Sequence, residues 1–148
     1  MRAYLLILGS NIEPEKNMPL ARTKLKVAFP DMLFSDFYET DPVGSVGPEK
    51  FWNAAGIIKT EISRDEVSLL VKKIESDLGR VRDPHNKFIP RTMDIDILPC
   101  SNWQNQAFIM VPLAEIAAEI IDPETGKTFG ELAGKCLEKT SGIRRIEA

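Results

Sequence analysis

The residues with the clearest chemical potential lie between positions 80 and 98. Asp94 and Asp96 are two residues apart in the segment MDIDI, where polar and apolar residues alternate. On a strand both side chains would point to the same face, about 6.6 Å apart. Carboxylates at this spacing can share one Mg²⁺ or hold two Mg²⁺ ions that are bridged by phosphate oxygens. Arg80, Arg82 and Arg91 supply the positive charge that a polyphosphate requires. The segment therefore predicts a site for magnesium and a phosphorylated ligand.

A second interpretation of the same segment is purely structural. Alternating aspartate and isoleucine is also the pattern of a strand with one solvated face. Aspartate is depleted in strands, however, and here two aspartates follow closely on an arginine. The combination favours metal binding over the solvated strand.

Composition limits the kinds of partner. The chain has 148 residues, 43% hydrophobic and 28% charged, which predicts one globular domain over 1–148. Its formal net charge is −3, so no overall basic field would attract nucleic acid or an anionic membrane. The arginines near position 80 are therefore expected to form a local anion site for a small ligand.

The cysteines and the N-terminal sequence indicate a compartment. Cys100 and Cys136 show no metal-binding spacing, which is typical of free thiols in a reducing compartment. The apolar run Tyr4–Leu8 is too short for a signal peptide or a membrane span and is expected to form a buried strand. We therefore predict a cytoplasmic protein with no membrane segment.

The apolar pattern predicts a specific order of elements. Strands and helices alternate as strand, helix, strand, strand, helix, strand, at residues 2–8, 15–29, 32–38, 51–62, 64–78 and 93–97. This order is the split βαβ pattern of ferredoxin-like folds. The expected fold is thus α+β, a βαββαβ sandwich with a mainly antiparallel sheet and helices packed on one face.

Particular residues define the two helices. Leu20, Leu25 and Val27 are expected to face the core from the first helix. Ser63 and Glu66 form a capping box that starts the second, which places Glu75 on its polar side.

The last third of the chain gives weaker signals. Residues 108–111 are expected to extend the sheet, and Pro112 to begin a short helix. Thr128 and Glu131 form a second possible capping box before a last helix. The tail 143–146 could add an edge strand.

Several segments together resemble a known family, the 6-hydroxymethyl-7,8-dihydropterin pyrophosphokinases (HPPK) of folate biosynthesis. The segments that carry the resemblance are LGSN at 8–11, FYETDPVG at 37–44, FWNAA at 51–55, PRTMDIDIL at 90–98 and PLAEIA at 112–117. The resemblance extends to about Asp122, and the block around the two aspartates is the most specific part of it.

The resemblance implies transfer of a pyrophosphoryl group from ATP to the hydroxymethyl group of the reduced pterin. Asp94 and Asp96 would hold two Mg²⁺ ions on the ATP phosphates. Arg80 and Arg91 would neutralise charge on the transferred group. Arg82 would bind the nucleotide from a mobile loop that carries Phe88 as an aromatic lid.

The same resemblance implies a pterin pocket. Asn53 would hydrogen-bond the amide edge of the pterin, together with groups around Thr40 and Val43. Phe51 and Phe108 would sandwich the ring. On the nucleotide side, Glu75 would support ATP. The partners implied are therefore a pterin and ATP, with the protein as a monomer or a homodimer.

One departure from the family bears on ATP. Typical members have a longer segment after the second aspartate, with a histidine and an arginine that contact ATP, whereas eleven residues separate Asp96 from Phe108 here. Trp103 or Gln104 could offer adenine a stacking surface or a donor instead. Two alternatives stay open: a non-catalytic homologue that binds pterin or nucleotide, and a related phosphotransferase with a different donor or acceptor.

Overall fold

A six-stranded sheet forms the centre of the molecule. The computed structural model describes residues 2–40, 51–79, 93–100, 102–139 and 142–146. Its strands are β1 (Arg2–Ser10), β2 (Leu33–Phe34), β3 (Phe37–Thr40), β4 (Phe51–Thr60), β5 (Asp94–Ile97) and β6 (Arg144–Ile146). They follow the order β5-β1-β4-β3-β6, with β2 also paired to β4. Every strand pair among the described residues is antiparallel.

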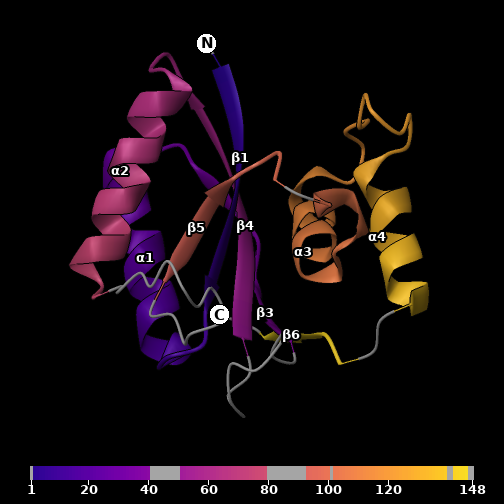
Figure 1. Ribbon diagram of the computed structural model, residues 1–148, viewed down its shortest axis with the longest axis horizontal. Coiled ribbons are helices and arrows are strands. Elements are labelled where there is room, and N and C mark those ends of the chain that lie inside the picture. The colour runs from indigo at the N-terminus through magenta and orange to yellow at the C-terminus, as the bar shows by residue number, and fades with distance from the viewer. Residues whose placement is uncertain (1, 41–50, 80–92, 101, 140–141, 147–148) are drawn as a thin grey trace.

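Helices cover both faces of this sheet. They are α1 (Pro14–Ala28), α2 (Arg64–Asp77), α3 (Ala107–Ala117) and α4 (Phe129–Lys139), with a short 3-10 helix, η1 (Trp103–Asn105). Figure 1 shows α1 and α2 on one side of the sheet and α3 and α4 on the other. The expected ferredoxin-like α+β fold is confirmed, but the expectation that helices pack on one face is wrong. The nearly continuous apolar run of β1 is the reason, because a strand with two apolar faces needs cover on both.

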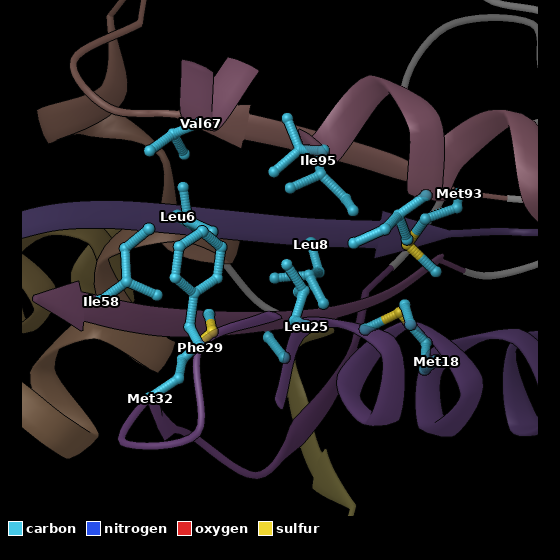
Figure 2. Close-up of a cluster of buried hydrophobic side chains, with 14 of the residues drawn as sticks. Leu6, Leu8, Met18, Leu25, Phe29, Met32, Ile58, Val67, Met93 and Ile95 are labelled. Carbon is cyan, nitrogen blue, oxygen red and sulfur yellow. The ribbon is translucent and has the colours of Figure 1, made fainter. Parts of the chain in front are cut away.

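The first core lies between the sheet and the pair α1 and α2. Leu6 and Leu8 of β1 point into it, and Figure 2 shows them among side chains from both helices. The other labelled members are Met18, Leu25, Phe29, Met32, Ile58, Val67, Met93 and Ile95. The second core contains Ile7 and Ala55 from the opposite sheet face, packed against α3, α4 and Trp103.

Helix α1 buries a different set of residues from the one expected. Met18, Ala21 and Leu25 are fully buried, at the spacing i, i+3, i+7 of one helix face. Of the three expected core positions, Leu25 is confirmed, whereas Leu20, 41% exposed, and Val27, 79% exposed, are wrong. Leu20 and Val27 are apolar, but their positions on the helix turn them away from the buried face that Met18, Ala21 and Leu25 form.

The segment 32–38 forms two short strands instead of one. Ser35 lies between β2 and β3, where its amide donates to the Ala55 carbonyl and its hydroxyl accepts from the Ala55 amide, both at 2.9 Å. The side chain thus takes over part of the ladder and interrupts the strand. Strand β4 ends at Thr60, two residues earlier than expected.

The apolar run near position 110 is helical. Phe108 to Val111 belong to α3, and Pro112 lies inside that helix, so the expected strand extension and the helix start at Pro112 are both wrong. A short apolar run does not distinguish a buried strand from a buried helix. The capping boxes at Ser63 and Thr128 are confirmed, since each hydroxyl accepts from the amide three residues on.

The remaining features concern the ends of the chain and membranes. The tail adds β6 to the sheet edge beside β3, as expected. Among the described residues, no helix is long and apolar enough to cross a membrane.

Candidate active site

Strand β5 presents its two aspartates to the side of the sheet that α3 and α4 cover. Asp94 pairs with Gly9 and Asp96 with Ile7, and Ile7 belongs to the second core. Ile95 points into the first core instead. Residues directly opposite on neighbouring strands share a face, so Asp94 and Asp96 lie together as the alternation predicts.

The outer edge of β5 is supported by helix α2. Glu75 is 2% exposed, and its Oε2 accepts a hydrogen bond of 2.8 Å from the Ile95 amide. The expected position of Glu75 on a polar, solvated face is therefore wrong. A buried carboxylate is stable only when it is well hydrogen-bonded, and the edge strand provides a donor. By accepting this bond, Glu75 fixes the backbone at Ile95, between the two aspartates.

The guanidinium of Arg64 binds the C-terminal end of β5 on the same outer edge. Arg64, at the start of α2, donates to the carbonyl of Ile97 at 3.1 Å and to that of Leu98 at 3.5 Å. Helix α2 therefore binds β5 at two points.

A row of residues that pair across neighbouring strands crosses the sheet, beginning at Asp94. The register aligns Asp94 with Gly9, Gly9 with Asn53, and Asn53 with Tyr38. Asn53 is 4% exposed, and its Nδ2 donates to Thr40 Oγ1 at 2.9 Å. The structure thus brings together Asp94, Asn53 and Thr40.

Gly9 gives the Asn53 amide its room, a role that the sequence alone did not reveal. A Cβ built on Gly9 would lie 3.1 Å from Asn53 Oδ1 and 4.0 Å from the Phe51 ring. The sequence shows a glycine near the end of an apolar strand, but only the register with β4 shows that Gly9 lies opposite Asn53.

The two expected aromatic clamp residues lie on facing elements. Phe51 begins β4 on the same sheet face as Asn53, because the two are two residues apart. Phe108 lies on α3, which contacts β4, and is partly buried against the second core. Both residues are half-buried.

Several expected site residues lie outside the described residues. They are Val43, Arg80, Arg82, Phe88 and Arg91. Their assignments remain predictions.

The donor set on β5 suits Mg²⁺. Asp94 is half-exposed and Asp96 is exposed, so a ligand can approach both residues from solvent. Within the described part of the chain, no group of three or more histidine, cysteine or acidic residues could form a complete protein cage. Mg²⁺ is commonly held by one or two carboxylates plus water and substrate phosphates, which these two residues fit.

The electrostatic field of the two aspartates extends to Cys100. Burial raises the pKa of the Cys100 thiol, and the negative charges of Asp96 and Asp94 raise it further. A bound cation would act against the second of these causes.

The short connection from β5 to α3 offers little to adenine. Trp103 is 8% exposed and packs edge-to-face on Phe129, with ring centroids 5.8 Å apart. Gln104 donates to Glu124 at 2.7 Å. The suggested stacking role of Trp103 is therefore wrong, because its indole fills the second core.

Fold and site define a ferredoxin-like α+β protein in which an acidic edge strand and a buried amide lie on one sheet face, one strand apart. A family model described as 7,8-dihydro-6-hydroxymethylpterin-pyrophosphokinase (HPPK) matches residues 5–118. The chain belongs to the HPPK family.

Similar proteins from bacteria agree with this assignment. The 2-amino-4-hydroxy-6-hydroxymethyldihydropteridine pyrophosphokinase of Methylorubrum extorquens is 34% identical, over 99% of both chains. The enzyme of the same description from Bacillus subtilis is 31% identical, over 95% of this chain and 93% of its own. The first alignment runs over 165 positions, more than the 148 residues here, so that relative has residues that this chain lacks.

Proposed function

We propose that this protein transfers a pyrophosphoryl group from ATP to 6-hydroxymethyl-7,8-dihydropterin in a Mg²⁺-dependent reaction. The observation that carries the proposal is the row across the sheet, in which Asp94 and Asn53 flank Gly9 on one face. This row puts a carboxylate suited to metal-bound phosphate on the same sheet face as an amide suited to a planar ring with an amide edge, with one strand between them. Family membership and the names of the similar enzymes support the same reaction.

The reaction needs no covalent intermediate. The pterin hydroxyl oxygen forms a bond to the β-phosphorus of ATP, the bond from that phosphorus to the α,β-bridging oxygen breaks, and AMP leaves. The hydroxyl proton is lost to solvent or to a phosphate oxygen. Positioning and charge neutralisation are the main catalytic contributions to such a transfer.

Each residue has a defined part in the proposal. Asp94 and Asp96 would hold Mg²⁺, which, when bound, would neutralise charge on the phosphates. Asn53 and Thr40 would orient the pterin edge. The aromatic residues Phe51, Phe108 and Phe88 would cover its ring, with Val43 at the pocket.

The arginines and Glu75 complete the nucleotide side of the proposal. Arg80 and Arg91 would stabilise the transferred group, and Arg82 would bind ATP. Glu75 would act indirectly, through the Ile95 amide that it binds. We further propose that 1–148 acts as one domain, in the cytoplasm, as a monomer or homodimer.

One observation favours a second candidate, a related phosphotransferase with a different donor. The connection between β5 and α3 is short, and its indole is buried, so the described residues provide few donors for the ATP base and ribose. A non-catalytic binder has less support, because two carboxylates at the exposed end of the sheet would not serve the pterin ring.

The deciding experiment measures AMP release from ATP and Mg²⁺ with and without 6-hydroxymethyl-7,8-dihydropterin. We expect AMP only when the pterin is present. The Asp94→Ala variant should lose more than roughly a hundredfold in rate, because even outer-shell changes around a metal commonly cost 10–100-fold. It should still bind the pterin.

Two other results would separate the alternatives. Pterin binding without AMP, for the unmodified chain, would contradict the proposal and favour the non-catalytic homologue. Pterin-dependent turnover with another nucleoside triphosphate, in preference to ATP, would favour the different donor.

A further inference from the structure

A polar cluster ties α3 to the sheet on the face that carries Asn53. It consists of Asp36, Tyr38, Glu115 and Arg145, and we call it the α3 clasp. Glu115 of α3 accepts hydrogen bonds from the Asp36 amide, at 3.0 Å to each of its oxygens. It also accepts one of 2.7 Å from the Tyr38 hydroxyl.

The last strand completes the clasp with a cation. Arg145 of β6 pairs with the Asp36 carboxylate at 2.6 Å and approaches Glu115 Oε1 at 3.7 Å. The Glu115 side chain is 19% exposed, so its bonds are partly shielded from water. Charge-assisted hydrogen bonds in such surroundings are stronger and more directional than neutral ones.

Apolar packing alone leaves the position of α3 poorly defined. The helix buries residues on most of its circumference, among them Ile109, Met110, Pro112 and Leu113. Hydrophobic burial is non-directional, so it resists separation of α3 from the sheet more than sliding or rotation. The clasp supplies directional bonds at one point of the helix.

That point is connected to the candidate pterin pocket in two ways. Tyr38 is the direct cross-strand partner of Asn53. Phe108 precedes Glu115 by seven residues, two helical turns, so both lie on the same side of α3 about 10.5 Å apart along its axis. Fixing Glu115 on β3 therefore fixes the side of α3 that presents Phe108.

We propose that Glu115 is a positioning residue for the pterin: by binding Tyr38 and the Asp36 amide, it holds α3 so that Phe108 faces the Asn53 side of the pocket. This inference rests on the proposed function, since it presumes a pterin between α3 and β4. It assigns Glu115 no contact with either substrate.

The test compares binding of two ligands to full-length variants by calorimetry. The ligands are the dihydropterin and the α,β-methylene analogue of ATP with Mg²⁺. Tyr38→Phe removes one hydroxyl, and Glu115→Gln removes the charge at nearly constant shape. We expect each variant to raise the Kd for the pterin roughly five- to tenfold, the effect of about one hydrogen bond. The nucleotide Kd should stay within about twofold. The double variant should be no weaker than the worse single variant, because both act through one interaction.

A matched control separates positioning from general loss of stability. Glu131 is also a helical carboxylate on this side of the sheet, and it accepts hydrogen bonds from Thr128 at the start of α4. Thr128→Ala removes the hydroxyl that caps α4 and should lower the free energy of unfolding by about 1 kcal/mol without changing the pterin Kd.

The outcomes are distinguishable. Unchanged pterin affinity in either cooperatively folded variant would overturn the inference alone, and so would an equal loss of pterin and nucleotide affinity. If the unmodified protein bound no pterin, the proposed function would fail and the inference with it. Should Tyr38→Phe not fold, Glu115→Gln still gives the decision.

Discussion

At the scale of single residues, Glu75 has a role that its type conceals. Its carboxylate is buried and binds the backbone amide between Asp94 and Asp96. A glutamate among lysines on a helix is usually solvated, so the sequence could not indicate this position. Its hydrogen-bond donor, the Ile95 amide, lies on β5 and reaches Glu75 only because α2 packs against that strand.

The loss of stability on substitution of Glu75 should depend on whether the new side chain can still accept the hydrogen bond from the Ile95 amide. Glu75→Ala leaves the Ile95 amide without its acceptor and should lower the free energy of unfolding by about 2 kcal/mol. Glu75→Gln keeps a carbonyl oxygen and should lower it by less. Urea denaturation measures both values, and AMP release should fall further in the alanine variant. Equal losses in the two variants would contradict the assignment.

Gly9 offers a test of the row beside Asp94. In Gly9→Ala the new methyl group would press on Asn53 Oδ1, so we expect pterin affinity to fall by roughly fivefold, the equivalent of one displaced hydrogen bond. Gly134→Ala is the control, because a Cβ there, on α4, meets nothing within 4 Å. That change should leave pterin affinity unaltered and stabilise the helix by about 0.5–1 kcal/mol. Unaltered affinity in both variants would show that Asn53 tolerates the methyl group.

Tyr38 predicts a dependence of stability on alkaline pH. Burial raises the pKa of Tyr38, and the hydrogen bond to Glu115 and its negative charge raise it further. A tyrosine in the unfolded chain ionises near pH ~10, so above that pH the folded state holds a proton that the unfolded state loses. The Tyr38 contribution is complete below that pH and declines above it. The stability difference between the unmodified chain and Tyr38→Phe should therefore shrink from about pH 9.5 upward, as measured by urea titrations. A constant difference would contradict the raised pKa.

At the scale of elements, the sequence predicted those whose periodicity is unambiguous. The capped helix α2 and the alternating strand β5 follow directly from local pattern. Helix α3 does not, because its run from Phe108 is apolar without a clear period, and its identity depends on burial between β4 and α4. The row of Asp94, Gly9 and Asn53 likewise depends on strand register, which no local pattern encodes.

The connection between β5 and α3 predicts weak nucleotide binding. It holds only residues 98–106, with Trp103 turned into the core. If two charged contacts to ATP are absent, affinity should fall by on the order of a hundredfold. Titration with the α,β-methylene analogue, next to the M. extorquens enzyme, measures the difference. Equal affinities would mean that other residues of this chain replace those contacts.

At the scale of the whole molecule, one sheet serves two cores and one site. The core of α1 and α2 holds β5 from behind, while the core of α3 and α4 places the aromatic and clasp residues in front. The strand order was inferable from the split βαβ pattern, but the cover on the second face depends on α3, which lies inside the matched residues 5–118, and on α4, which lies beyond them.

The position of β5 at the border of the sheet has a consequence for solubility. A border strand exposes amides and carbonyls that can recruit a strand from another chain, and natural proteins commonly block this. Here Glu75 occupies the outward amide of Ile95, and Arg64 occupies the outward carbonyl of Ile97. The same two side chains that keep the acidic strand in place thus also protect it against edge-to-edge aggregation.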